Sequence, residues 1–356
     1  MGVCGASWKK REVVTEEMQS FDCGARAAVV VTRAELVESE HFVCYAVVDR
    51  HARVVESNGD IDRPVYMRSS AKPLIATAMV ASGAPDRFGF SDQEIAIAAG
   101  SHSGEPKHVA AVRSMLRKTG LDESALRCGA HAPTHGPSAD ALCLAGELPK
   151  PIHNNCSGKH AGILALAVQL GAAPDGYLVV DHPAEREILR VCSELLGVPL
   201  ADIRIGVDGC GIPVIAVPLK TAAYFYARLG ETAQFPVQLA SALTRVRDAM
   251  ISHPEYVAGS NRFDTDLMTA ARPNILAKGG AEGYHGSAAL AQGLGMTVKI
   301  ADGNYRAVAP FVLARLSRLG ILDATQRTML DSYRAPKIRN HAGTVVGEIL
   351  NLDPLT

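Results

Sequence analysis

The sequence of 356 residues has few aromatic residues (5%), no excess of one charge and no long apolar run. Lys and Arg total 36 and Asp and Glu total 37, so the formal net charge is -1. Nucleic-acid-binding proteins usually show a basic excess or basic blocks, and membrane-spanning helices need ~20 apolar residues. We therefore expect neither a nucleic-acid partner nor a membrane segment. Lys9, Lys10 and Arg11 precede no apolar stretch, which predicts a cytoplasmic protein without a secretory signal.

The eight cysteines are widely spaced and include no Cys-x-x-Cys pair, so free thiols are expected rather than a disulfide framework. The apolar fraction, 47%, is typical of a globular chain that can bury its own core. No Pro/Gly/Ser-rich linker divides the sequence. We predict one domain over residues 23–356, preceded by a flexible extension over residues 1–22.

The order of the structural signals predicts an α+β fold. The middle of the chain, about 70–258, is mostly helical: Ser91 with Glu94 forms a capping-box pattern, for example. Strand-like patterns gather at the two ends, about 25–65 and 260–350. We therefore expect one mainly antiparallel sheet built from both chain ends, with a helical subdomain inserted between them. The strand-like segments are 27–32, 41–49, 52–57, 274–278, 296–301 and 344–349, with a further one inside the helical part at 203–218.

A serine and a lysine three residues apart begin one predicted helix. Ser69 and Lys72 would share a helix face, and Pro73 is tolerated in a first turn. The apolar run 74–81 would bury the helix behind them. Burial disfavours a charged lysine, and a neutral amine can take the proton of a neighbouring hydroxyl to create a nucleophile. The alternative is a surface helix start with a capping serine and a solvated lysine.

Two glycine-containing polar segments could approach a ligand closely, because small residues leave room for it. The first is Gly100–Glu105, which contains Ser101 and His102. The second is Lys278–Gly283, directly after an apolar strand, and it is similar to the Lys-Thr-Gly element that accompanies Ser-x-x-Lys in penicillin-recognising enzymes. Ordinary turns, with a capping serine or a solvated lysine, are the alternative for both.

Two cysteines lie in polar, glycine-flanked turns. Cys156 precedes an apolar helix, and Cys210 follows a predicted strand. Such a pair could bind a soft cation such as zinc, although the spacing matches no standard zinc pattern. A free thiol pair, or Cys156 as a nucleophile with His160 as its base, are the other interpretations. The further donors nearby are His153, Lys159, His160 and Asp208.

Taken together, these segments resemble the signature blocks of the rhizobial-type (class 3) L-asparaginases, over roughly residues 25–350. Five blocks in one order are far more specific than any single one. The resemblance implies a fold like that of serine β-lactamases and glutaminases, and a homodimer that hydrolyses L-asparagine to L-aspartate and ammonia. The blocks are Arg68–Pro73, Gly100–Glu105, Asn154–His160, Asp208–Gly211 and Lys278–Gly283.

The resemblance also implies a role for individual residues. Lys72 would take the proton of Ser69, which attacks the side-chain amide, and Lys278 would position Ser101 as a proton relay or as the alternative nucleophile. A penicillin-recognising hydrolase and a non-catalytic zinc-binding protein are the competing functions; the sequence lacks the Ser-Asp-Asn motif expected of the former. The implied set is catalytic Ser69, Lys72, Ser101 and Lys278, substrate-binding Arg68, His102 and Asp208, and a Zn²⁺ held by Cys156, Lys159 and Cys210.

Overall fold

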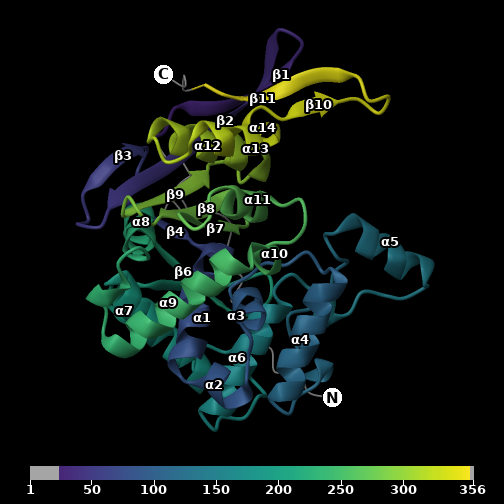
Figure 1. Cartoon of the computed structure of the whole chain (residues 1–356), viewed down its shortest axis with the longest axis vertical. Helices are drawn as coiled ribbons and strands as arrows, with labels where there is room; N and C mark the ends of the chain where they lie inside the picture. The colour runs from purple at the N-terminus through teal and green to yellow at the C-terminus, as the bar shows by residue number, and fades with distance from the viewer. Residues whose placement is uncertain (1–23, 353–356) are drawn as a thin grey trace, which may run out of the picture.

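An antiparallel sheet forms one end of the molecule and a group of helices forms the other (Figure 1). The computed structural model describes residues 24–352, so the extension predicted over residues 1–22 lies outside the described residues. The sheet has the order β10-β11-β1-β2-β9-β8-β7, and β3 pairs with β2. Its strands are β1 (Ala27–Arg33), β2 (Leu36–Asp49), β3 (Val54–Asn58), β7 (Ile275–Gly280), β8 (Tyr284–Ala289), β9 (Leu294–Ile300), β10 (Lys337–Arg339) and β11 (Val345–Asn351).

Strands from both chain ends meet in the middle of this sheet. Strand β2 pairs with β9, and Tyr45 lies opposite Val298 in that register. Strands β7 and β8 are buried at every position, which requires cover on both faces. The predicted sheet from the two ends is therefore confirmed. The strand-like segment at 203–218 instead forms a separate small sheet of β4 (Pro64–Tyr66), β6 (Pro213–Pro218) and β5 (Arg204–Val207), in that order.

The helices between the two sheet-forming parts also match the prediction. The capping box of Ser91 and Glu94 is present. Among residues 24–352, no helix is long and apolar enough to span a membrane. The helices are α1 (Lys72–Ala81), α2 (Ala84–Phe88), α3 (Asp92–Ala98), α4 (Pro106–Lys118), α5 (Gly136–Leu144), α6 (Ser157–Gln169), α7 (Pro183–Leu196), α8 (Leu219–Arg228), α9 (Val237–Ser252), α10 (Pro254–Val257), α11 (Phe263–Ala270), α12 (Val308–Arg318), α13 (Ala324–Met329) and α14 (Asp331–Arg334).

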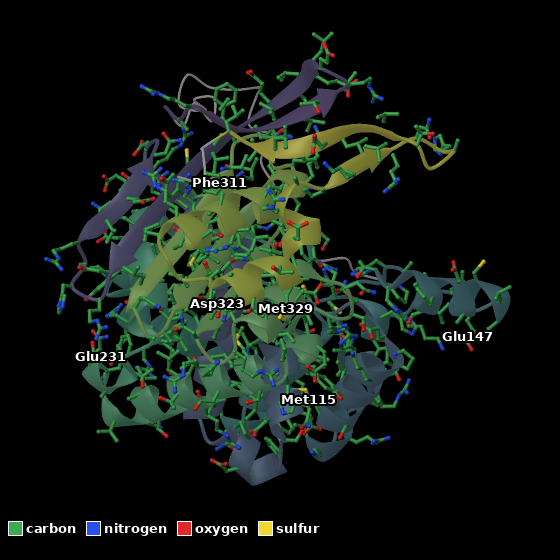
Figure 2. The ribbon with its side chains drawn as sticks, turned by 45° about the horizontal axis from the view of Figure 1, so that its top comes forward. Met115, Glu147, Glu231, Phe311, Asp323 and Met329 are labelled. Atoms are coloured by element: carbon green, nitrogen blue, oxygen red, sulfur yellow. The ribbon has the colours of Figure 1, made fainter. Side chains whose placement is uncertain are left out.

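Helix α1 lies at the centre of the helical part, in contact with α6, α7 and α9. Its small apolar side chains allow this close packing, and all of its residues except Ile75 are buried. Helix α6 approaches α3 so closely that a Cβ at Gly158 would lie 2.5 Å from the carbonyl oxygen of Ile97. By contrast, α5 has no buried residue and ends near Glu147 on a projection from the body (Figure 2). The buried starts of α1 and α6 carry the residues of the candidate site.

Candidate active site

A pocket of about 280 Å³ lies where the edge strand β7 meets the 3-10 turn Arg68–Ala71, just before α1. We call it the serine pocket. It brings together Ser69, Ser101 and Lys278, which are about thirty to two hundred positions apart in the sequence. Three of the four residues predicted to be catalytic therefore line one cavity. The lining residues are Ser69, Ser101, Asn155, Ala258, Arg262, Asp264, Lys278, Gly279, Gly280, Ala281, Glu282 and Tyr305.

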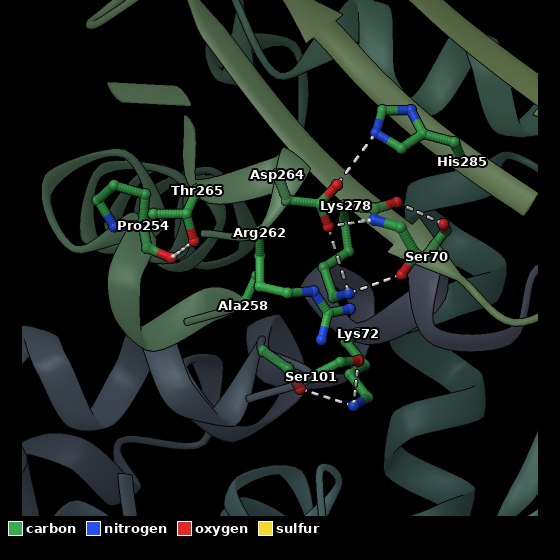
Figure 3. Close-up of polar contacts among 12 residues, drawn as sticks. Ser70, Lys72, Ser101, Pro254, Ala258, Arg262, Asp264, Thr265, Lys278 and His285 are labelled. Atoms are coloured by element: carbon green, nitrogen blue, oxygen red, sulfur yellow. Dashed lines mark hydrogen bonds and ion pairs between the residues drawn. The ribbon is translucent and has the colours of Figure 1, made fainter. Parts of the chain in front are cut away.

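Lys72, the fourth predicted catalytic residue, lies directly beneath this pocket. Ser69 sits in the 3-10 turn Arg68–Ala71, and Lys72 is the first residue of α1. The Lys72 amine donates hydrogen bonds to the Ser101 hydroxyl at 2.8 Å and to the Gly100 carbonyl at 2.6 Å (Figure 3). The Ser69 hydroxyl makes no hydrogen bond with the described residues. Lys72 thus contacts Ser101, the serine predicted to pair with Lys278, rather than its own predicted partner Ser69.

Both lysines of this region are buried, and burial disfavours their charged forms. Lys278 lies within the buried strand β7 and has 1% exposure. Burial lowers the pKa of Lys278 to about 7, with the nearby charge of Lys72 adding to the effect and that of Asp264 opposing it. Burial likewise lowers the pKa of Lys72. Each amine can therefore reach its neutral form more easily than a solvent-exposed lysine.

Asp264 holds the Lys278 segment in place. Its carboxylate accepts hydrogen bonds from the Gly279 amide at 2.6 Å and from His285 Nε2 at 3.2 Å, and lies 3.9 Å from the Lys278 amine (Figure 3). Burial alone would raise the pKa of Asp264, but the hydrogen bond from His285 and the charge of Lys278 hold it below its usual range. Sequence reasoning missed Asp264, because no local motif marks it and only the packing of α11 against β7 brings it here.

The three predicted zinc ligands also come together, in what we call the thiol–lysine cluster: Cys156, Lys159, Cys210 and Asp208. The Lys159 amine donates to Cys210 Sγ at 3.0 Å and lies 4.0 Å from Asp208 Oδ2. The Lys72 amine donates to Cys156 Sγ at 3.4 Å, so the cluster adjoins the serine pocket. No group of three or more His, Cys, Asp or Glu side chains among residues 24–352 is arranged to hold a metal. A metal here would therefore require Lys159 as a donor.

The charges of the cluster are set by its own members. A hydrogen bond from Cys210 lowers the pKa of Cys156 well below its ordinary value, and the charges of Lys159 and Lys72 lower it further. The same hydrogen bond, together with burial, raises the pKa of Cys210. Burial would lower the pKa of Lys159, but Cys156, Cys210 and Asp208 raise it. These shifts favour a thiolate at Cys156 beside an ammonium at Lys159.

The histidines near this cluster have other partners. His160 Nδ1 is hydrogen bonded to the Tyr177 hydroxyl at 2.7 Å, and His153 Nδ1 accepts from the Lys150 amide at 3.0 Å. No side-chain hydrogen bond joins His160 to Cys156 in the described part of the chain; their one polar contact is the backbone bond from the His160 amide to the Cys156 carbonyl, at 3.0 Å. The arrangement therefore offers no support for Cys156 as a nucleophile with His160 as its base.

The three residues predicted to bind substrate lie outside the lining of the serine pocket. Arg68 Nε donates to Asp208 Oδ1 at 2.8 Å, and the two line a smaller cavity beside Lys159. His102 is fully buried, with Nε2 hydrogen bonded to Ser157 Oγ at 2.9 Å and Nδ1 accepting from the Gly104 amide at 3.1 Å. Their binding of substrate stays a prediction. Arg262, which sequence reasoning missed, does line the pocket.

Two serine hydroxyls in one pocket with buried lysine amines are an arrangement that can support acyl transfer, in which a serine attacks a carbonyl and a lysine carries its proton. The family comparison agrees with this class. The family model described as L-asparaginase II matches residues 29–350. The chain belongs to the L-asparaginase II family.

Other comparisons add little to this assignment. No curated protein sequence matches the chain. The solved structure of Mglu is 19% identical, over 78% of this chain and 66% of that one, with a TM-score of 0.34. The chain thus spans just under two thirds of the Mglu chain. A β-lactamase from Mycobacterium bovis is 16% identical, over 82% and 95% of the two chains (TM-score 0.37). A putative β-lactamase from Bacteroides dorei is 12% identical, over 80% and 92% (TM-score 0.39).

Proposed function

We propose that the protein hydrolyses the side-chain amide of L-asparagine, giving L-aspartate and ammonia through a serine acyl-enzyme. The observation that carries the proposal is the 2.8 Å contact between the Lys72 amine and the Ser101 hydroxyl, in a pocket that also holds Ser69. A base hydrogen bonded to a hydroxyl that can relay a proton from a second serine in the same pocket is an arrangement that can support covalent catalysis. Membership of the L-asparaginase II family supports an amide as the substrate.

In the proposed reaction, Ser69 is the nucleophile and Ser101 is the relay. The Ser69 oxygen bonds to the amide carbon, its proton passes to Ser101, and the Ser101 proton passes to neutral Lys72. The carbon–nitrogen bond then breaks, and the proton returns from Lys72 through Ser101 to the departing ammonia. Water attacks the resulting ester by the same route in reverse, releasing L-aspartate and restoring the Ser69 hydroxyl. Lys278, paired with Asp264, lies at the other wall of the pocket, where its charge affects the protonation of the neighbouring groups.

We also propose that Cys156, Lys159 and Cys210 hold one Zn²⁺. The juxtaposition of two thiols and an amine supports this, because soft thiolate donors suit zinc. When bound, the ion would supply a fixed positive charge that orients polar groups of a ligand.

A cytoplasmic homodimer is proposed as well, on the resemblance to class 3 L-asparaginases. Sedimentation of the purified protein measures the oligomeric state.

Ammonia release from three compounds tests the function. We expect release from L-asparagine, weaker release from L-glutamine and no hydrolysis of a penicillin analogue. Hydrolysis of the penicillin analogue without ammonia release from either amide would instead support a penicillin-recognising hydrolase. Zinc binding without turnover of any of the three would support a non-catalytic zinc-binding protein.

A further inference from the structure

Helix α5 projects from the molecule with apolar side chains exposed. Figures 1 and 2 show it standing away from the helical body, on the side of α4. None of its nine residues is buried. Leu144 at its end is 89% exposed, and Leu148 just beyond it is 81% exposed. We call residues 131–149 the arm. A helix of this length is only marginally stable alone in water, so a partner that covers it would stabilise the arm.

The root of the arm is fixed to the body. The His135 amide donates to the Ser103 carbonyl at 3.0 Å, and His135 Nδ1 lies 2.8 Å from the Ser138 hydroxyl in the first turn of α5. Pro133 is buried against Gly104, where an added Cβ would lie 2.9 Å from the Pro133 Cβ. The arm therefore leaves the body at a defined point. A partner meets a surface that is already ordered at its root, which lowers the cost of binding.

An apolar groove of about 370 Å³ lies between the arm and α4. Small and apolar side chains of the two helices form most of its walls, and Leu144 and Leu148 are not among them. One chain therefore exposes two separate apolar surfaces, the groove and the two leucines. A helix laid into an apolar groove is a common form of recognition between protein chains. The helix residues that line the groove are Pro106, Val109, Ala110 and Arg113 of α4 and Ser138, Ala141 and Leu142 of α5.

The two sides of the groove carry opposite charges. Helix α4 contains only basic charged residues, at Lys107, Arg113, Arg117 and Lys118. The arm contains Asp140 and Glu147 and neither lysine nor arginine. Within residues 24–352, no ion pair joins the two sets; Glu147 lies 3.8 Å from Lys150 instead. An acidic apolar helix is therefore complementary to this groove, and such complementarity favours one partner over others.

We propose that two copies of the chain associate about a twofold axis, with the arm of each lying in the groove between the arm and α4 of the other. A second copy fits best because one chain supplies both the acidic, apolar helix and the basic, apolar groove. A twofold axis forms each of these contacts twice, as in most homodimers. This inference rests on the homodimer put forward with the proposed function, and it assigns the surface through which the dimer forms.

Sedimentation of the full chain over a range of concentrations tests the surface. The double variant Leu144→Asp, Leu148→Asp places charges where apolar contacts are expected, so it should raise the dissociation constant of the dimer by at least ~100-fold. Val237→Asp is the matched control. Val237 is 87% exposed at the start of α9, away from the arm (Figure 1), and its substitution should leave the dimer unchanged. Circular dichroism checks that each variant is folded.

Disulfide cross-linking gives a second measurement that does not weaken the interface. Cys143 is an exposed thiol on α5, and Arg113 lines the groove on α4. In Arg113→Cys, oxidised glutathione should link the two positions between chains, and a dimer should appear on a non-reducing gel. A bond within one chain would leave a monomer on the same gel. Arg113→Cys combined with Cys143→Ser is the control and should give no cross-linked dimer.

The outcomes separate the inference from the proposals on which it rests. A wild-type dimer that survives the two leucine substitutions, together with cross-linking only within chains, would overturn the inference and leave the homodimer standing. A wild-type protein that sediments as a monomer at every concentration would overturn both. Ammonia release is measured on the same wild-type protein, so a failure of the proposed reaction is recognised independently of its oligomeric state.

Discussion

Lys159 in the thiol–lysine cluster and Lys278 in the serine pocket are buried to the same degree, with 2% and 1% exposure, yet their charges differ. Burial lowers the pKa of Lys278 to about 7, and the single carboxylate of Asp264 only partly offsets it. Burial acts on Lys159 too, but two thiols and Asp208 together raise its pKa. The neighbouring groups, rather than the depth of burial, therefore decide which lysine is easily neutralised and which is a fixed cation.

Two buried carboxyl groups repeat the contrast. Asp264 receives hydrogen bonds from Gly279 and His285, which hold its pKa below its usual range despite burial. Glu185 on α7 lines the small cavity beside Lys159, and its Oε1 has no hydrogen-bond partner within residues 24–352. Burial raises the pKa of Glu185 to about 8. The carboxylate of Asp264 in the serine pocket thus has hydrogen-bond donors that stabilise its charge. Glu185, behind the thiol–lysine cluster, lacks them at Oε1, and its raised pKa favours the protonated form at neutral pH.

The largest expected effect comes from removing the nucleophile and tests whether the chemistry belongs to the serine pocket rather than to the thiol–lysine cluster. Ser69→Ala should lower kcat by at least ~10³-fold, a typical cost of losing a covalent catalyst. Ser101→Ala should cost ~10²-fold, since it removes only the relay. Ser82→Ala, at the far end of α1, is the matched control and should keep full activity. Near-wild-type turnover in Ser69→Ala would transfer the nucleophile to Ser101.

The next effect concerns Lys278, the lysine that the comparison identifies as easily neutralised. Because burial lowers the pKa of both Lys278 and Lys72, activity should rise with pH above neutrality to an optimum near pH ~8–9. Lys278→Met removes a neighbouring positive charge, so the apparent pKa of the remaining base rises and the limb moves to higher pH. Profiles of kcat/KM from pH 5 to 10 measure this. An acidic optimum, or an unmoved limb in an active variant, would show that the two lysines titrate independently.

Metal binding tests the other region of the comparison, the thiol–lysine cluster. We expect about one zinc per chain in protein purified without chelator, and its loss in Cys210→Ser. The hydrogen bond to Cys156 and burial raise the pKa of Cys210, and its anionic neighbours raise that of Lys159. Zinc binding should therefore displace about two protons, and the affinity for zinc should fall with acid. Calorimetry in buffers of different ionisation enthalpy counts those protons. Cys143→Ser, at an exposed thiol, is the control, and full zinc content in Cys210→Ser would contradict the site.

The sequence was informative where chemistry is local. The spacing of Ser69 and Lys72 at a helix start, and the strands at the two chain ends, were both predictable because each depends on a few neighbouring residues. The contact of Lys72 with Ser101 was not. It depends on how closely the Gly100 segment packs: a Cβ at Gly100 would lie 2.7 Å from the Tyr256 carbonyl oxygen. Such approaches are set by tertiary packing and leave no pattern of their own.

The same reason explains the residues that sequence reasoning missed. Arg262 lies just before α11, and Asp264 lies in its first turn. No motif surrounds them, and only the contact of α11 with β7 places them at the serine pocket. Arg68 illustrates the converse. Its motif was found, but its ion pair with Asp208 depends on the turn between β5 and β6, about 140 residues away. Motifs identify the groups, whereas the fold decides the partners.

The smallest expected effect is on stability, at Glu185. Its folded pKa of about 8 lies above the ~4.3 of an unfolded glutamate, so the folded state binds more protons between these values. Stability should therefore fall as pH rises from about 4 to about 8, and level off above that. Glu185→Gln stays neutral, so it should be more stable than wild type above pH 8, by a few kcal/mol at most, and equal to it near pH 4. Urea unfolding across this range measures the difference. Glu187→Gln, on the same helix but paired with Arg190, should follow the wild-type pH dependence. Parallel curves for Glu185→Gln and wild type would mean that Glu185 is ionised in the folded protein, and that the carboxylate behind the cluster is as well satisfied as Asp264.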